Sequence, residues 1–156
     1  MGLNEVSVEV RFSEIDSMNI AHNARYYDWF EVGRFTFTKN IFNFDMNMLL
    51  TDYRLPVVKS SCKYLFRIIF GDQLVVKTFM YIDGSTKLRY YYEIYNQNKI
   101  LCAIGSTQHT ILAQNNKLLL QVDEFMKEKF FEAQKMYPEC FMSQEQMIRI
   151  ENRINR

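Results

Sequence analysis

A carboxylate near the start of the chain separates a segment typical of a strand from one typical of a buried helix. Residues 6–12 alternate apolar and polar side chains, as a strand with one buried face does. Asp16 follows, then a short polar stretch, and a very apolar helix is expected from Asn23. A helix N-terminus offers unpaired N–H groups and about half a positive charge, which suit an oxyanion. Asp16 opposite such a terminus would be placed to hydrolyse an ester or thioester, as nucleophile or as general base on water.

The composition indicates one soluble domain rather than a nucleic-acid or membrane protein. With 156 residues, 48% of them hydrophobic, the chain is long enough for one domain with a core. Its 19 basic and 18 acidic residues leave a net charge of +1, so no overall field attracts nucleic acid or an anionic membrane. No run of 18 apolar residues predicts a transmembrane segment.

The cysteines predict a reducing compartment. Cys62, Cys102 and Cys140 are an odd number at wide spacing, without a Cys-x-x-Cys pair or a signal peptide. We therefore expect reduced thiols in a cytoplasmic protein, with the cysteines as small buried side chains rather than metal ligands. No metal site is predicted.

The helix expected over residues 23–42 is apolar around almost its whole circumference, which is typical of a buried helix. Gly33 lies in its middle, although glycine disfavours a helix by about 0.8 to 1 kcal/mol relative to alanine. A sheet that packs too closely for a side chain at this position would explain the glycine.

Four longer strand patterns follow the helix, over residues 58–70, 74–82, 87–95 and 100–113. The short turn signals between them predict an antiparallel meander. We therefore expect an α+β fold in residues 1–121, with a curved antiparallel sheet wrapped around one long central helix.

Residues 122–156 are predicted to form a C-terminal helical extension. A first helix is expected from Asp123 and ends before Pro138. Ser143 and Gln146 have the spacing of a capping box, which predicts a second helix after them.

Three short motifs resemble the opening strand, loop and central helix of hotdog-fold thioesterases. The similarity is to the branch of 4-hydroxybenzoyl-CoA thioesterase and the YbgC-like acyl-CoA thioesterases, and it covers roughly residues 5–120. The motifs are Arg11-Phe12-x-Glu14-x-Asp16, His22-Asn23-x-x-Tyr26 and Trp29-Phe30-Glu31-x-Gly33-Arg34. The resemblance implies a hotdog fold, assembly as a homodimer or a homotetramer made of two dimers, and hydrolysis of an acyl-CoA or aroyl-CoA thioester.

The resemblance also implies roles for the residues of these motifs. Asp16 would be the catalytic carboxylate, and the backbone N–H of Asn23 would polarise the thioester carbonyl. His22 would either act in catalysis or hold the loop and line the pocket. Asn19 stands where many relatives have glycine, and asparagine also accepts a positive φ.

Other residues are expected to support the site. Tyr26, Tyr27 and Trp29 are interpreted first as core residues and second as the lining of an acyl pocket. Lys59 and Lys63 lie on the polar face of a strand, where they could meet the phosphates of coenzyme A or simply face water. Glu31 is expected to pair with Arg34 or to support the loop, and His109 to be a strand residue rather than a ligand.

Three alternatives stay open at the level of the sequence: a thioesterase acting on acyl carrier protein, an enoyl-thioester hydratase, and a noncatalytic protein that binds acyl thioesters. The hydratases resemble this chain less, because no His-Phe-Pro-Gly segment is present. No cofactor is expected, since coenzyme A would be part of the substrate and product.

Overall fold

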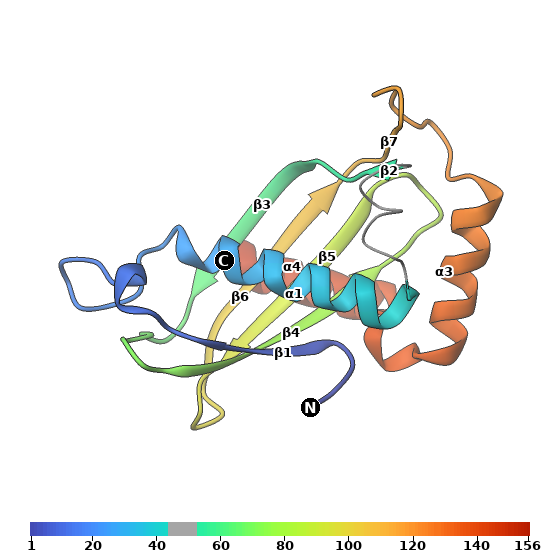
Figure 1. Ribbon diagram of the computed structural model, residues 1–156. Helices are drawn as coiled ribbons and strands as arrows, with labels where there is room; N and C mark the ends of the chain where they lie inside the picture. Colours follow the sequence, from blue (N-terminus) through green and yellow to red (C-terminus); the bar gives the residue numbers. More distant parts are fainter. Residues whose placement is uncertain (44–52) are drawn as a thin grey trace.

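The computed structural model describes residues 1–43 and 53–156 and contains an antiparallel sheet with one long helix across its face (Figure 1). The strands are β1 (Glu5–Glu9), β3 (Val57–Tyr64), β4 (Gln73–Tyr81), β5 (Leu88–Tyr95) and β6 (Leu101–His109). They are ordered β1-β4-β5-β6-β3, and the helix is α1 (Arg25–Phe42). The predicted α+β arrangement, an antiparallel sheet around a central helix, is confirmed.

Glycines allow α1 to approach the sheet closely. A Cβ at Gly33 would lie 2.6 Å from Oγ1 of Thr78 in β4, and a Cβ at Gly105 in β6 would lie 2.2 Å from the ring of Phe30. The Phe30 ring occupies this space and stacks on Tyr92 with the ring centroids 4.4 Å apart. The close contact predicted at Gly33 is therefore confirmed, and the sheet is its cause.

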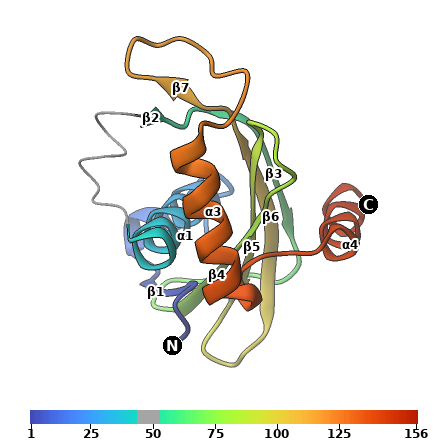
Figure 2. The same ribbon diagram turned by 90° about the vertical axis from the view of Figure 1, so that its right-hand side faces the viewer.

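The remaining elements cover the ends and the other face of the sheet. Two short strands, β2 (Tyr53–Arg54) and β7 (Leu112–Ala113), pair with each other. Figure 2 shows α3 (Glu124–Met136) on the same side of the sheet as α1, whereas α4 (Gln144–Asn155) lies on the opposite side. Short 3₁₀ turns cover Phe12–Glu14 and Pro138–Cys140.

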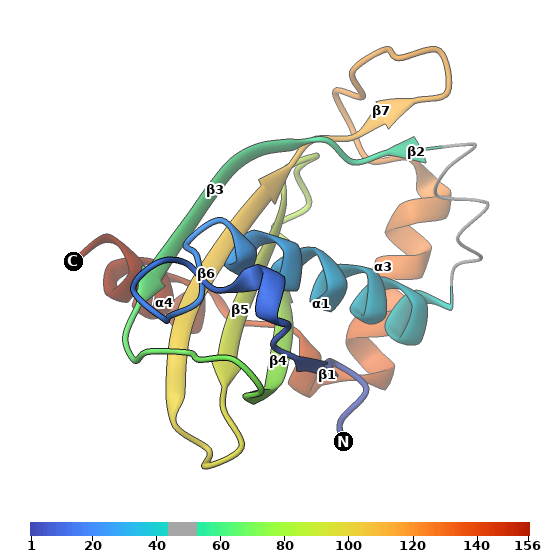
Figure 3. The ribbon, with the colours of Figure 1, turned by 60° about the vertical axis from the view of Figure 1, so that its left-hand side comes forward.

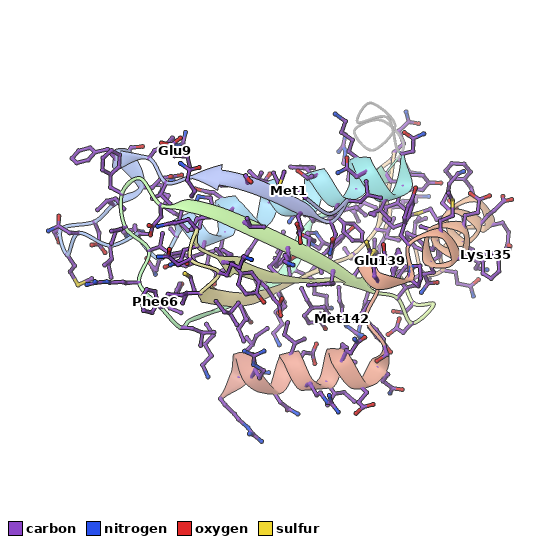
Figure 4. The ribbon with its side chains drawn as sticks, turned by 90° about the horizontal axis from the view of Figure 1, so that it is seen from below. Met1, Glu9, Phe66, Lys135, Glu139 and Met142 are labelled. Atoms are coloured by element: carbon purple, nitrogen blue, oxygen red, sulfur yellow. The ribbon has the colours of Figure 1, made fainter. Side chains whose placement is uncertain are left out.

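Helix α4 is attached to the outer face of the sheet by one buried side chain and one strong hydrogen bond. Ile150 is buried, and the hydroxyl of Tyr91 donates to Oε1 of Glu151 over 2.6 Å. Figure 4 shows this helix running beneath the sheet after Met142. Its start was predicted correctly, since Ser143 and Gln146 form the capping box.

Some predicted boundaries are wrong. The strand predicted over residues 58–70 ends at Tyr64, and the one predicted over residues 100–113 is divided into β6 and β7. Helix α1 begins at Arg25 and is not buried all round, because Val32 and Phe35 are exposed on the side away from the sheet. Residues 44–52, which follow this helix, lie outside the described residues.

Two absences hold for the described part of the chain. Within residues 1–43 and 53–156, no helix is both long enough and apolar enough to cross a membrane. The same residues contain no group of three or more His, Cys, Asp or Glu side chains that could hold a metal ion. The cysteines Cys62, Cys102 and Cys140 are free thiols.

A chain of hydrogen bonds crosses the core beside α1. His109 places Nδ1 2.9 Å from the carbonyl oxygen of Leu55 and Nε2 2.9 Å from Oγ1 of Thr107, which lies 2.6 Å from the hydroxyl of Tyr92. A carbonyl only accepts, so Nδ1 carries the proton and Nε2 accepts from Thr107. Because His109 is fully buried, burial lowers its pKa to about 4.

The burial of His109 predicts that the folded protein loses stability in acid. Unfolded His109 takes up its proton near pH 6.5, whereas the folded ring resists protonation until about pH 4. The unfolded state therefore binds more protons in this window, and stability falls as the pH is lowered. We expect the free energy of unfolding to drop by about 2 kcal/mol between pH 7 and pH 4.5 through this residue alone.

Urea denaturation at several pH values checks this expectation against His109→Gln, which keeps a donor and an acceptor but does not titrate. The wild type should lose more stability than the variant over this pH window. Equal slopes for the two proteins would contradict the assignment.

Candidate functional site

Asp16 lies at the turn of a small β-hairpin, residues 14–22, which we call the site hairpin. Its arms are joined by hydrogen bonds from His22 N–H to the carbonyl of Glu14 (2.8 Å) and from Asp16 N–H to the carbonyl of Ile20 (2.9 Å). The turn is closed by Asn19 N–H, which donates to the carbonyl of Asp16. Asn19 has a φ of 60°, as predicted from its place in the loop.

The carboxylate of Asp16 is held by the turn itself. Its Oδ1 accepts a hydrogen bond from Met18 N–H over 2.7 Å. The side chain is half-buried, and its second oxygen accepts no hydrogen bond from the described residues. One oxygen therefore orients the group while the other is free to react with a substrate or a water molecule.

The N-terminal end of α1 carries free donors next to this carboxylate. His22 lies just before the helix, where its Nδ1 accepts a hydrogen bond from the N–H of Ala24, the N-cap residue, over 3.1 Å. The N–H groups of Asn23 and Tyr26 donate no hydrogen bond within the part of the chain that the structure describes. Unpaired N–H groups at a helix start are the donors that an oxyanion requires.

An open hollow of about 570 Å³ brings these groups together. Figure 3 shows the site hairpin in front of the sheet at the N-terminal end of α1. The lining comes from the site hairpin, the start of α1 and the segment that leaves β3. Its residues are Asp16, Met18, Ile20, Ala21, His22, Asn23, Tyr26, Tyr64, Leu65, Phe66 and Arg67.

The structure separates the aromatic residues of the predicted acyl pocket. Tyr26 lines the hollow and packs edge-on against Tyr64, with the ring centroids 4.7 Å apart. Tyr27 is partly exposed outside the lining, and Trp29 is buried beneath the site hairpin. Only Tyr26 of the three is thus in place to touch a substrate within one chain, as far as the described residues show.

The predicted cationic residues lie on the other face of the sheet. Lys59 lines a small separate cavity beneath α4 together with Arg89 and Glu151. Lys63 is four residues further along β3, and strand alternation places it on the same face. Arg67, in the segment after β3, is the basic residue that borders the hollow in the described part of the chain.

The expected pair of Glu31 and Arg34 is not formed within the described residues. Glu31 is exposed, whereas the guanidinium of Arg34 lies over the ring of Phe35, 5.4 Å from its centroid. The charge of Arg34 also lies near the hydroxyl of Tyr92. Arg34 therefore turns toward Tyr92 in the sheet and not toward Glu31.

Other potential nucleophiles near the hollow are protonated at neutral pH. Burial raises the pKa of the Cys62 thiol to about 12 and that of the Tyr64 hydroxyl to about 12. Burial likewise raises the pKa of Tyr26. Within the described residues that line the hollow, Asp16 is the one carboxylate.

Two features of the site were not predicted from the sequence. Glu14 is buried behind the site hairpin, and residues 65–67 form one wall of the hollow. Glu14 belongs to the same motif as Asp16, two residues before it, and this spacing could have indicated that Glu14 belongs to the site. The wall could not be predicted, because its apolar alternation looks like a continuing strand.

Comparison with known proteins identifies the same family that the motifs resemble. The sequence model of the Thioesterase-like superfamily matches residues 10–130. The putative acyl-CoA thioesterase YneP of Bacillus subtilis (strain 168) is 30% identical over 109 residues, which are 70% of this chain and 79% of that protein.

Solved structures share the fold. A DHNA-CoA thioesterase from Staphylococcus aureus superposes with a TM-score of 0.77 at 24% identity and covers 89% of this chain and 95% of its own. SAV2348 from the same organism, solved in complex with CoA, gives a TM-score of 0.74 at 17% identity and covers 91% of this chain and 87% of its own. At these identities the likeness concerns the fold.

The matched region begins one residue before the first motif and continues through β6, so it contains the site hairpin, α1 and the wall of the hollow but not β1. The chain belongs to the Thioesterase-like superfamily and is a thioester hydrolase with the hotdog fold.

Proposed function

We propose that this chain hydrolyses acyl-CoA or aroyl-CoA thioesters at Asp16. The observation that carries the proposal is the shared hollow, which both Asp16 and Asn23 line. Within the described residues, one oxygen of Asp16 and the N–H of Asn23 make no hydrogen bond. A thioester carbonyl between them would meet the carboxylate at its carbon and the N–H at its oxygen. The B. subtilis relative, named a putative acyl-CoA thioesterase, and the neighbour solved with CoA support this substrate class.

The chemistry can follow either of two routes. If Asp16 is the nucleophile, it forms an anhydride with the acyl group, the C–S bond breaks, and the CoA thiolate leaves and is protonated by water. A water molecule then hydrolyses the anhydride. If Asp16 is a general base, it takes a proton from a water molecule that attacks the carbonyl directly. In both routes coenzyme A enters as part of the substrate, and no separate cofactor is required.

The position of His22 supports a mechanism in which Asp16 works without a histidine partner. Its Nδ1 accepts the hydrogen bond of Ala24, and the neutral ring then carries its proton on Nε2. A ring held in this way organises the start of α1 and lacks a free basic nitrogen. This arrangement favours hydrolysis over an enoyl-thioester hydratase, which would use a carboxylate and a histidine together.

The lining of the hollow suits an apolar acyl or aryl group. Tyr26, Tyr64, Leu65 and Phe66 contribute aromatic and apolar side chains to its lining, and Arg67 lines it as well. This combination is compatible with the branch of 4-hydroxybenzoyl-CoA thioesterase and the YbgC-like enzymes, which remains part of the proposal. A contribution of Lys59 and Lys63 to phosphate binding would require a second copy of the chain.

Asp16→Asn is the direct test of the mechanism. Asparagine keeps an oxygen that accepts from Met18 N–H, so the turn should stay folded, but it can neither attack nor deprotonate water. We expect kcat/KM for the best substrate to fall by about 10² to 10⁴. The measurement is thiol release from a panel of short and long acyl-CoA and aroyl-CoA thioesters and of acyl carrier protein thioesters, with enoyl hydration read separately.

Asp28→Asn is the matched control, since Asp28 is an exposed carboxylate paired with Arg25 near the same helix start. It should retain full activity. Thiol release by Asp16→Asn equal to that of the wild type would refute the mechanism. Hydration without thiol release, or binding without turnover, would refute the activity.

The N–H of Asn23 can be tested by removing it. Asn23→Pro lacks the donor, whereas Asn23→Ala keeps it. Loss of one such donor typically costs about 2.7 to 4 kcal/mol in the barrier, so we expect kcat of the proline variant to fall by about 10² to 10³. Circular dichroism must show that the variant is folded. Equal activity of a folded proline variant and the alanine variant would exclude this N–H as the oxyanion donor.

We also propose that two copies assemble along β3. Among the described residues this strand pairs with β6 on one side only, and its first four residues are exposed, including Val57 and Val58. An apolar edge strand of this kind favours antiparallel pairing with a second copy about a twofold axis. The end of the same strand leads into the wall of the hollow, so a second copy would lie close to the site.

Val58→Asp tests the assembly, because Val58 is 55% exposed in the single chain and a charge there should disturb pairing rather than folding. Sedimentation equilibrium of the wild type should give at least twice the chain mass of 18.8 kDa, and the variant should shift toward the monomer. Leu120→Asp, at an 85% exposed position in the segment after β7, is the control and should sediment like the wild type. A wild type that is monomeric at micromolar concentration would contradict the proposal; four times the chain mass would indicate a tetramer.

We further propose that the protein is cytoplasmic, that it has no nucleic-acid partner, and that the chain is divided into a domain over residues 1–121 and a helical extension over residues 122–156. The free cysteines and the balanced charge support the first two.

A further inference from the structure

Glu14 is the first residue of the site hairpin, and its carboxylate is buried between the hairpin and α1. Its side chain is 3% exposed. Oε2 accepts from the backbone N–H of Arg11 over 2.8 Å, and Oε1 accepts from Nη2 of Arg11 over 2.9 Å. The indole Nε1 of Trp29 in α1 also points at Oε1, over a longer 3.4 Å. One carboxylate therefore receives donors from the chain before the site hairpin and from the helix behind it.

The environment keeps this carboxylate ionised. Burial by itself would raise its pKa, but the hydrogen bonds from the side chain and the backbone of Arg11 outweigh burial and hold the pKa of Glu14 below its usual value. The side chain of Arg11 is 71% exposed, so this ion pair contributes little to stability. The interior partner is Trp29, which is buried and donates its indole N–H to no other acceptor within the described residues.

Glu14 is connected to α1 at two points. Its carbonyl accepts the N–H of His22, and the ring of His22 accepts the N–H of Ala24, the residue directly before the helix. Its carboxylate meets Trp29 one turn further into the helix. Because Asp16 follows only two residues later in the same arm of the hairpin, the two connections fix where Asp16 lies relative to the helix start.

We propose that Glu14 is a positioning residue for the reaction, which sets the distance between the Asp16 carboxylate and the N–H groups at the start of α1. The inference rests on the proposed hydrolysis at Asp16. Displacing a reacting group by about 1 Å can cost 10²-fold in rate, so a link of this kind acts on kcat even where the fold is unchanged. A purely structural Glu14 would instead change only the amount of folded protein.

Glu14→Gln is the informative variant, since it keeps the size of the side chain but replaces one acceptor oxygen by an NH₂ group. That group must face either Arg11 or Trp29, both of which donate. We expect kcat per folded molecule to fall about tenfold, with KM within about twofold of the wild type. Trp29→Phe should lower kcat similarly. The double variant should be no slower than the slower single variant, because both substitutions break the same contact between Glu14 and Trp29.

Glu151→Gln is the matched control. It also removes a carboxylate that accepts from a buried aromatic side chain, the hydroxyl of Tyr91, but on the opposite face of the sheet. Its kcat should equal that of the wild type even if its melting temperature falls as far as that of Glu14→Gln. Unchanged kcat in Glu14→Gln, additive losses in the double variant, or an equal loss in Glu151→Gln would each overturn the proposal.

A second measurement does not depend on activity. Hydrogen exchange followed by NMR should show faster exchange of the N–H groups of Met18, His22 and Ala24 in Glu14→Gln, but not in Glu151→Gln. Unchanged exchange at these three positions would overturn the positioning role. If the wild type hydrolysed no thioester while exchange changed as expected, the proposed function would fail and the link between Glu14 and the site hairpin would stand.

Discussion

Helix α1 lies so close to the sheet that a single added methyl group would push it away, and the geometry of the site depends on this contact. Two glycines create the space, Gly33 on the helix and Gly105 on β6. Phe30 fills it by lying over Gly105 and stacking on Tyr92. Since interiors are packed as densely as organic crystals, contacts of this kind leave little freedom to shift. They fix the axis of α1, and with it the place where the N-terminal end of the helix meets the site hairpin.

The site is held by a different kind of force. Its elements are joined by hydrogen bonds of backbone groups and by two polar side chains, His22 and Glu14, rather than by burial of apolar surface. One such bond contributes only about 1 kcal/mol to stability, but it is directional, and several together determine the orientation of a short segment. Burial positions the helix and hydrogen bonds then position Asp16 against it, so changes at the site can alter catalysis while the fold stays intact.

Features that depend on a residue's immediate neighbours could be predicted from the sequence. The cap of α4 at Ser143, the positive φ of Asn19 and the tight contact at Gly33 follow from local chemistry, and each is confirmed. The antiparallel sheet around a central helix was predictable for the same reason, since its turns and its period are local. Asp16 could be placed near the helix start because only a short loop separates them.

Features that depend on the path of the backbone in the folded protein could not be predicted. The apolar alternation of β3 continues through Phe66 and Phe70, yet both side chains are exposed, because the chain has left the sheet after Tyr64. Residues 65–67 of this segment form the wall of the hollow. The pattern is the same for a strand and for such a wall. Likewise, alternation shows that Lys59 and Lys63 share a face, but not that this face lies opposite the site. The orientation of the His22 ring is a side-chain rotation that no sequence pattern specifies.

That orientation changes how the site is understood. A histidine beside an aspartate suggests a pair in which one group activates the other, and the sequence left this reading open. In the structure the acceptor nitrogen of His22 is occupied by the N–H of Ala24, and the cysteine and tyrosines nearby are held in their protonated forms by burial. In the mechanism that we propose, the carboxylate of Asp16 is the reacting group, and Asn23, whose N–H is unpaired within the described residues, lines the same hollow. In that mechanism one carboxylate and one helix end would be sufficient, because the thiolate is a good leaving group that needs no proton donor at the moment the C–S bond breaks.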